Sequence, residues 1–177
     1  MIKMKKTITV FGSSLPAEGE EQFIFAEELG KELARNNFNV CTGGFAGIMN
    51  AVSKGAVSEK AKAIGVTVDL WNAKPSKYLT EEIKCKTLFE RIEQLISIGD
   101  GFVVLQGGTG TMLELTVVWE FMNKGMLKEK PIVTHSNMWK EIIVIMEKQI
   151  VTEKRKTGLV KSFDTVDEIV SFLVKYL

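Results

Sequence analysis

The sequence predicts an α/β fold, a Rossmann-like doubly wound parallel sheet with helices on both faces. Short runs rich in β-branched and aromatic residues alternate with amphipathic segments of helical length along the chain. One run, residues 101–105, is continuously apolar, which is typical of a parallel strand covered on both faces. Glycine-rich turns follow three of the runs. Repeated alternation of β and α segments indicates a parallel sheet with ligands at its carboxyl edge.

The individual elements follow from these patterns in chain order. We expect strands at 7–11, 38–41, 63–68, 83–85, 101–105, 131–134 and 158–160. We expect helices near 20–36, 48–59 and 88–98, from about 111 onward, at 138–150 and at 166–175. The 101–105 strand belongs in the middle of the sheet because it carries the most apolar run.

Length and composition indicate one globular domain covering residues 1–177. Hydrophobic residues make up 45% of the chain and charged residues 25%, and 23 Lys and Arg nearly balance 22 Asp and Glu. This balance leaves no net field to attract nucleic acid or anionic lipid, and the apolar runs are too short to cross a bilayer. We therefore expect neither a nucleic-acid partner nor a membrane partner.

Cysteine and histidine usage argues against disulfide and metal chemistry. Cys41 and Cys85 have no metal-ligand spacing, and His135 has no second histidine with which to share a metal. No segment reads as a secretory leader. The expectation is a reduced, cytoplasmic protein without a metal or another cofactor.

Three predicted strands run directly into small residues that can donate main-chain hydrogen bonds. The residues we expect to bind a substrate are Gly12 and Ser13 after the first strand, Gly43 and Gly44 after the second, and Gly107, Gly108, Thr109, Gly110 and Thr111 after the 101–105 strand. Glycine lets the main chain approach a ligand closely, and a following helix offers free N–H groups, so phosphate suits such turns. For a single turn, tight strand-to-helix geometry is an equal explanation. Neither a Walker A sequence nor a clean GxGxxG is present.

Glu114 and Arg91 are the two charged residues placed near these turns. Glu114 stands three residues after Thr111, which fits a capping box, but it also fits a carboxylate facing the sugar of a bound nucleotide and kept ionised by the helix N-terminus. Arg91 borders the apolar stripe of its helix, where it can form a structural ion pair or present its planar fork to phosphate.

The helix after the 106–111 turn is apolar nearly all the way round, from Met112 to Met122. One face of a sheet cannot cover such a helix. A twofold homodimer is the simplest second burying surface, and a thick core within the chain is the alternative.

Taken together, these residues resemble the LOG family, the cytokinin-activating phosphoribohydrolases that are often mislabelled lysine decarboxylases. The resemblance runs from about residue 8 to about residue 146, and its most specific part is GGTGTMLE at 107–114, similar to the family's PGGxGTxxE with an upstream arginine. It implies a Rossmann-like homodimer that cleaves the N-glycosidic bond of a nucleoside 5′-monophosphate. By motif position it implies that Glu114 and Arg91 are catalytic, that the Gly107 to Thr111 turn holds phosphate and ribose, and that Gly43, Gly44 and Ser13 line the rest of the site. We expect base contacts from loops such as 69–80.

Three residues depart from the family pattern. Gln106 replaces the motif's proline, Ile92 replaces a lysine after the arginine, and Asn50 replaces a glycine that is common after the second turn. Related proteins of this fold include non-catalytic carriers of molybdenum cofactor and nucleotide-sensing domains, so a binding or carrier protein is the alternative function. Lysine decarboxylase chemistry is rejected, because no lysine lies in or next to the glycine turns to form a Schiff base.

Overall fold

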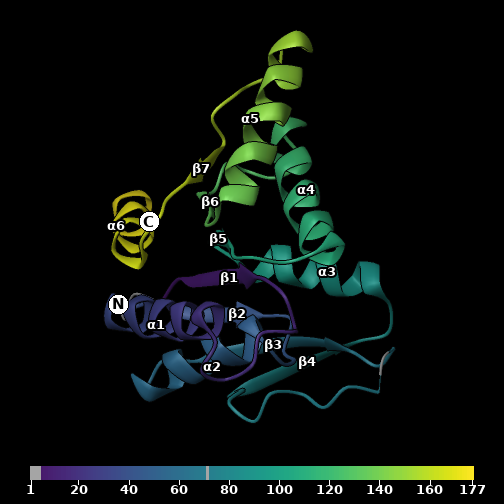
Figure 1. The fold of residues 1–177 in the computed structure, drawn as a ribbon. Helices are drawn as coiled ribbons and strands as arrows, with labels where there is room; N and C mark the ends of the chain where they lie inside the picture. Colours follow the sequence, from purple (N-terminus) through teal and green to yellow (C-terminus); the bar gives the residue numbers. More distant parts are fainter. Residues whose placement is uncertain (1–4, 71) are drawn as a thin grey trace.

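The computed structural model describes residues 5–70 and 72–177, and within them it contains a seven-stranded parallel sheet in the order β4-β3-β2-β1-β5-β6-β7 (Figure 1). All six pairs of neighbouring strands are parallel. The strands are β1 (Thr7–Phe11), β2 (Asn39–Thr42), β3 (Ala63–Val68), β4 (Glu81–Cys85), β5 (Gly101–Val104), β6 (Ile132–Thr134) and β7 (Val160–Ser162). This confirms the predicted Rossmann-like sheet.

The chain builds one half of the sheet outward from β1 to β4 and then returns to add β5, β6 and β7 on the other side of β1. The direction of winding therefore reverses between β1 and β5. Parallel α/β sheets bind ligands at such a switch point, beyond the carboxyl ends of the strands. The turns after β1 and β5 flank this point, and the turn after β2 lies one strand away.

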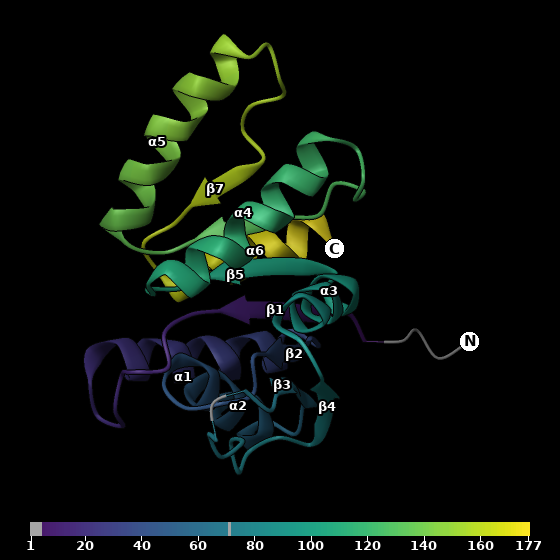
Figure 2. The same cartoon turned by 90° about the vertical axis from the view of Figure 1, so that its right-hand side faces the viewer.

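Six helices cover the two faces of the sheet in the described residues (Figures 1 and 2). They are α1 (Glu21–Arg35), α2 (Ile48–Ser58), α3 (Leu88–Ile98), α4 (Thr109–Asn123), α5 (Asn137–Thr152) and α6 (Val166–Tyr176). Side chains of α1, α2 and α6 share one buried cluster with the strands, and those of α3, α4 and α5 share the other. Alternate residues of the central strands feed the two clusters, as in β5, where Phe102 and Val103 point to opposite faces.

The predicted elements differ from the observed ones mainly at their ends. The β3 and α3 boundaries are as predicted, and β5 lies beside the central strand β1. The last strand begins at Val160 instead of 158, and α4 begins at Thr109, two residues earlier than predicted. The earlier start of α4 changes the position of Glu114 within its helix, with consequences for the site.

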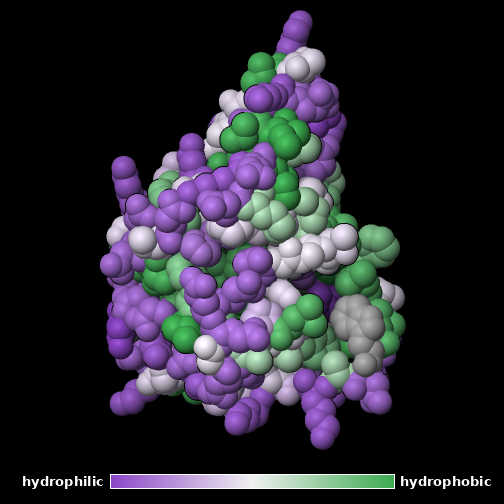
Figure 3. Space-filling view, in the orientation of Figure 1, coloured by the Kyte–Doolittle hydropathy of each residue, from purple (hydrophilic) through white to green (hydrophobic). Residues whose placement is uncertain are grey.

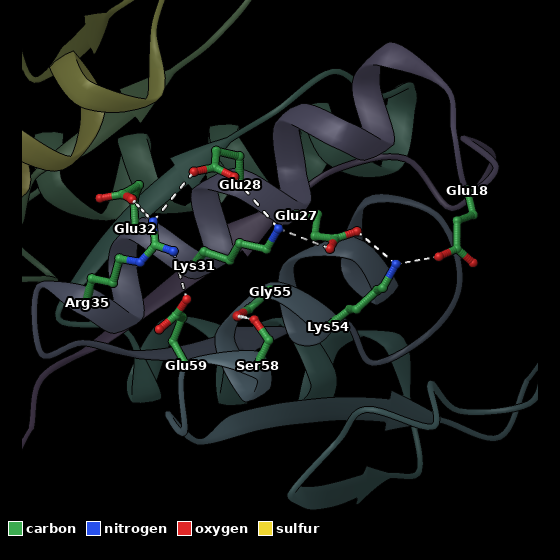
Figure 4. A network of polar contacts seen from close by, with 10 residues as sticks. All are labelled: Glu18, Glu27, Glu28, Lys31, Glu32, Arg35, Lys54, Gly55, Ser58 and Glu59. Atoms are coloured by element: carbon green, nitrogen blue, oxygen red, sulfur yellow. Dashed lines mark hydrogen bonds and ion pairs between the residues drawn. The ribbon is translucent and has the colours of Figure 1, made fainter.

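The outer surface over α1 and α2 is dominated by ion pairs (Figure 4). Lys54 of α2 pairs with Glu18 and with Glu27 of α1, and Arg35 of α1 contacts Glu59 beyond the end of α2 at 2.8 Å. Buried glycines let these two helices approach closely, since a Cβ at Gly55 would lie 2.0 Å from the Glu27 carbonyl oxygen. Across residues 5–70 and 72–177, no helix is long and apolar enough to span a bilayer, and no cluster of three potential metal ligands forms.

Candidate active site

The three glycine turns meet at the carboxyl edge of the sheet, and Ser13 joins them through its main chain. The Ser13 N–H donates to the Gln106 carbonyl in the third turn at 2.9 Å, and the Ser13 carbonyl accepts from the Ile48 N–H after the second turn at 2.9 Å. A cavity of about 500 Å³ opens there. Its lining includes Gly12, Ser13, Gly43, Gly108, Thr109, Gly110, Thr111, Arg91 and Glu114, which are nine of the eleven residues predicted for the site.

The other two predicted residues, Gly44 and Gly107, do not line the cavity. Gly44 is buried with φ +78°, and a Cβ there would lie 2.7 Å from a methyl group of Thr67. A Cβ on Gly107 would lie 2.1 Å from the Thr111 hydroxyl. These glycines shape the turns and do not face the cavity, so the simple steric explanation holds for this pair.

Helix α4 presents its N-terminus to the cavity. Its N-cap is Gly108, which carries no side chain to bind the first-turn N–H groups, and the first intrahelical bond runs from the Met112 N–H to the Gly108 carbonyl at 3.0 Å. A Cβ on Gly108 or Gly110 would meet no atom within 4 Å. The main-chain N–H groups at the start of α4 are therefore available to an anion, which the helix dipole also favours.

Arg91 is buried beneath the second turn, at 6% exposure, and its guanidinium is held by main-chain carbonyls. Its Nε donates to the Val66 carbonyl at 2.8 Å and its Nη2 donates to the Gly43 carbonyl at 3.2 Å. A Cβ on Gly43 would lie 1.8 Å from Nη2, so only glycine at this position allows the arginine its place. Helix α3, whose N-cap Thr87 accepts from the Glu90 N–H, fixes the backbone from which Arg91 projects.

Glu114 faces Arg91 across the cavity floor, with Nη1 of Arg91 at 3.4 Å from Oε1 of Glu114. The capping-box interpretation is wrong, because α4 begins at Thr109 and Glu114 is the sixth residue of the helix, in its second turn. Its carboxylate therefore contacts an arginine 23 residues away in the sequence instead of the N–H groups of its own helix.

Burial raises the pKa of Glu114 from 4.5 to about 7, and the nearby Arg91 offsets only part of this rise. The expectation that the helix N-terminus keeps this carboxylate ionised is not met. The effect of the helix dipole is strongest in the first turn, and Glu114 lies in the second turn. Its side chain is also shielded from water, which disfavours the charged form. A carboxyl group with a pKa near 7 exchanges protons readily at neutral pH, which suits general acid–base chemistry.

Seven further residues line the cavity that were not among the predicted site residues: Val10, Phe11, Ser14, Leu15, Phe45, Met49 and Ala73. Most of them stand within a few residues of a predicted glycine turn, so the turns were the signal that located them. Ala73 belongs to the 69–80 segment from which base contacts were expected. The apolar members give the cavity surfaces against which a flat, weakly polar ring can pack.

A family model described as SLOG cluster 4 matches residues 5–170 of the chain. The chain belongs to the SLOG cluster 4 family. This membership confirms the resemblance recognised in the GGTGTMLE motif, which in the structure forms the third glycine turn and the first turns of α4.

Curated proteins similar to this SLOG cluster 4 chain carry nucleotide-cleaving names. It is 30% identical over 132 residues to the cytokinin riboside 5′-monophosphate phosphoribohydrolase of Rhodococcoides fascians, covering 72% of this chain and 66% of that protein. It is 31% identical over 105 residues to the pyrimidine/purine nucleotide 5′-monophosphate nucleosidase of Escherichia coli K12, covering 54% of this chain and 23% of that protein. The chain thus spans slightly less than two thirds of the first relative and about a quarter of the second.

Solved structures with the same fold include molybdenum-cofactor proteins. The molybdenum cofactor carrier protein of Chlamydomonas reinhardtii superposes with a TM-score of 0.77 at 22% identity, covering 97% of this chain and 98% of that one. The molybdenum cofactor binding protein of Rippkaea orientalis superposes with a TM-score of 0.78 at 18% identity, covering 97% and 96%. At these identities the likeness establishes the fold of this SLOG cluster 4 protein and nothing about its ligand.

Two departures from the LOG pattern lie away from the site of this family member. Gln106 borders a separate cavity of about 150 Å³, beside Phe25 and His135. Ile92 is 4% exposed in the apolar cluster formed with α4 and α5. Neither side chain lines the main cavity, so neither substitution removes a group from it. The third departure, Asn50, does contact a segment that reaches the cavity.

Proposed function

We propose that this protein hydrolyses the N-glycosidic bond of a nucleoside 5′-monophosphate, releasing a free base and ribose 5-phosphate. The observation that carries the proposal is the buried Arg91–Glu114 pair in the same cavity as the open N-terminus of α4. The N-terminus of α4 suits an anion such as phosphate, and the Arg91–Glu114 pair suits proton transfer and charge stabilisation a short distance away. The names of the R. fascians and E. coli relatives support the same reaction class.

In this proposal the phosphate rests on the N–H groups at the start of α4, within the turn from Gly108 to Thr111. The ribose then lies toward Glu114, whose carboxylate stabilises positive charge at the anomeric carbon and orients a water molecule. The base extends toward the β2 and β3 side of the cavity, beside Phe45 and Met49. Neighbouring strands are about 4.8 Å apart, so the turns after β5 and β2, separated by β1, are spaced for a ligand of nucleotide length.

The chemical step breaks the bond between the anomeric carbon and the base nitrogen and forms a bond from that carbon to a water oxygen. The bonding electrons leave with the base, which takes up a proton from solvent, and the attacking water gives a proton to Glu114, which then returns it to solvent. Positive charge on the sugar develops as in other glycosidic cleavages, and a carboxylate beside it lowers the barrier. Arg91 is anchored by the Val66 and Gly43 carbonyls, so its part is to hold and partly neutralise Glu114 beside the leaving base.

The direct experiment is to incubate the protein with a panel of purine and pyrimidine 5′-monophosphates and to measure free base together with ribose 5-phosphate. Equimolar release of both products from at least one nucleotide supports the proposal. Release of base from the unphosphorylated nucleosides at the same rate would contradict the phosphate role assigned to α4.

A non-catalytic carrier or sensor is the second candidate function. Its support is the fold shared with the molybdenum-cofactor proteins. Tight binding of a nucleotide or a pterin without any release of base would favour it. In that case Ile92→Lys and Gln106→Pro restore the family residues, but neither side chain lines the cavity, so we expect neither to create turnover.

We also propose that the protein forms a homodimer through the exposed faces of α4 and α5. Helix α4 buries Leu115, Val118, Trp119 and Met122 within the chain, so the intrachain core accounts for part of its apolar surface. Leu113 of α4 and Met138, Val144, Ile145 and Val151 of α5 remain exposed. Apolar side chains that emerge among polar ones along α5 (Figure 3) support a contact with a second copy there.

For its location we propose the cytoplasm. Cys41 and Cys85 are both free and buried, and burial raises the pKa of both thiols, that of Cys41 to about 12. Thiols of this kind are unreactive, and free thiols are common in reducing compartments.

A further inference from the structure

Residues 72–80, which lead into β4, reach the cavity at Ala73 and are bonded to the second glycine turn through Ser76. Residues 72–75 are all exposed, and Ala73 is the one of them that lines the cavity. In the described residues 72–80 the segment forms no helix, although it connects two adjacent parallel strands. Its position therefore depends on a few specific contacts.

Ser76 supplies the contacts nearest to Ala73. Its N–H donates to the Gly44 carbonyl at 2.8 Å, and its hydroxyl donates to Oδ1 of Asn50 at 2.7 Å. The same hydroxyl oxygen accepts from the Tyr78 N–H at 3.2 Å. Ser76 and Asn50 are both half-buried, so water competes only partly for these groups.

The rest of the segment is anchored further from the cavity. Leu79 packs on Gly65, where a Cβ would lie 2.4 Å from a Leu79 methyl group, and the Thr80 N–H donates to the Ala63 carbonyl at 2.8 Å. These contacts secure the end that leads into β4. Among these hydrogen bonds of residues 72–80, those of Ser76 lie nearest to Ala73 in the chain, and Asn50 supplies its side-chain partner outside the segment.

Asn50 is the third residue of α2, directly after Met49, which itself lines the cavity. A glycine at this position would have no side chain with which to hold Ser76. We propose that Asn50, through Ser76, is a positioning residue that sets the base end of the cavity and thereby selects the nucleotide base. The proposal rests on the proposed function for its substrate class, but the contact itself can be tested without turnover.

Loss of the Asn50–Ser76 contact should affect the binding of the base and leave phosphate binding and catalysis unchanged. Asn50 and Ser76 lie on the β2 and β3 side of the cavity, whereas the proposed phosphate site lies at α4 and the reacting carbon lies near Glu114. Loss of the contact should therefore raise KM for nucleotides by about 3- to 10-fold, the worth of one hydrogen bond, and leave kcat within about 2-fold. The affinity for ribose 5-phosphate, which has no base, should not change.

The test compares Ser76→Ala and Asn50→Gly with the conservative variants Ser76→Thr and Asn50→Asp, which keep the hydroxyl and the acceptor oxygen. Ser58→Ala, which removes the hydroxyl that an exposed serine donates to the Gly55 carbonyl at the far end of α2, is the control. We expect Ser76→Ala and Asn50→Gly to speed amide hydrogen exchange in residues 72–80 and to raise KM by different factors for different bases. The double variant should be no worse than either single variant, and the conservative variants should behave like the native protein.

Three results would overturn the proposal: unchanged exchange in residues 72–80, additive effects in the double variant, or an equal loss of ribose 5-phosphate affinity. If the native protein releases no base from any nucleotide, the proposed hydrolysis fails, and the equilibrium Kd for adenosine 5′-monophosphate, uridine 5′-monophosphate and ribose 5-phosphate takes the place of KM. The exchange and affinity measurements then still decide whether Asn50 and Ser76 set the base end.

Discussion

The two faces of the sheet differ in what their helices present to the outside. Over α1 and α2, half-buried and exposed charges are paired across the helices, as between Lys54 and Glu27 or Arg35 and Glu59 (Figure 4). On the opposite face, α5 exposes Val144 and Ile145, and the one buried ion pair of the site joins α3 to α4. The charges on α1 and α2 pair with one another on a surface that contacts solvent. The face covered by α3, α4 and α5, the second face, carries the proposed catalytic pair and the proposed contact with another subunit. The outer surface of α1 and α2 is the scaffold face, whereas the first turn of α2 reaches the cavity through Met49.

The two faces should differ most in how far stability and turnover fall when one arginine is replaced on each face. Arg91→Met leaves the Val66 and Gly43 carbonyls and the Glu114 carboxylate without their partner, so we expect the free energy of unfolding to fall by about 3–5 kcal/mol. Turnover should fall by at least about 10²-fold. Denaturant titration and base release measure the two effects.

Arg35→Met on the α1 surface is the matched control, because Arg35 is equally rich in partners but exposed. We expect native turnover and a much smaller change in the unfolding midpoint, since exposed ion pairs add little to stability. Equal destabilisation by both substitutions would show that the two faces do not differ in the way described.

A charge introduced on each face should separate the contact surface from the free surface. Ile145 of α5 is 65% exposed and Ile24 of α1 is 58% exposed, so exposure alone predicts the same outcome for both. We expect Ile145→Asp to weaken the dimer by at least about tenfold, because an unpaired charge would be buried in the contact, and Ile24→Asp to leave it unchanged. Light scattering at micromolar concentration decides this, and a monomeric native protein would remove the dimer proposal.

The pH dependence of the second face follows from Glu114. Its pKa of about 7 in the folded protein lies above the ordinary value of 4.5, so the folded state holds this proton more tightly than the unfolded state. The free energy of unfolding should therefore fall, on the order of 1–3 kcal/mol, as the pH rises from about 4.5 to about 7, and then level off.

Activity should show the opposite trend, because the ionised carboxylate is the proposed base: kcat/KM should rise through an apparent pKa near 7. In Glu114→Gln, the fall in the free energy of unfolding between about pH 4.5 and 7 that is due to Glu114 should disappear. A kcat/KM that falls as the pH rises through 7 would instead assign Glu114 the role of an acid.

The smallest effect is expected on the scaffold face. Lys54→Met removes the cation between Glu18 and Glu27, and the resulting loss of stability should be slight at low salt and should shrink toward 1 M salt, where screening reduces the native ion pairs. Turnover should not change. A clear loss of turnover would mean that the α1 and α2 surface takes part in the site.

The sequence predicts the fold better than the site because the fold is encoded locally. The α3 boundaries follow from a visible apolar stripe, and β3 follows from its run of apolar and β-branched residues. The glycine turns likewise located most of the cavity lining. These signals lie within a few residues of the structure that they specify.

The remaining features depend on residues far apart in the chain. Thr111 and Glu114 have the spacing of a capping box, but Gly108 begins α4 and Arg91 of another helix takes the carboxylate. The pKa of Glu114 reflects burial that only the folded chain creates. The Asn50–Ser76 contact spans 26 residues and joins a helix to an irregular segment, so no local pattern announces it.

The most direct test of the proposed function compares Glu114→Gln with Glu27→Gln, which changes an ion-paired glutamate on the scaffold face. Glu114→Gln keeps the shape of the side chain and removes its charge and its basicity. We predict that base release from the preferred nucleotide falls by about 10²–10⁴-fold while nucleotide affinity stays near that of the native protein, and that Glu27→Gln retains native turnover. Cleavage by Glu114→Gln at the native rate would contradict the proposed catalytic role of this carboxylate.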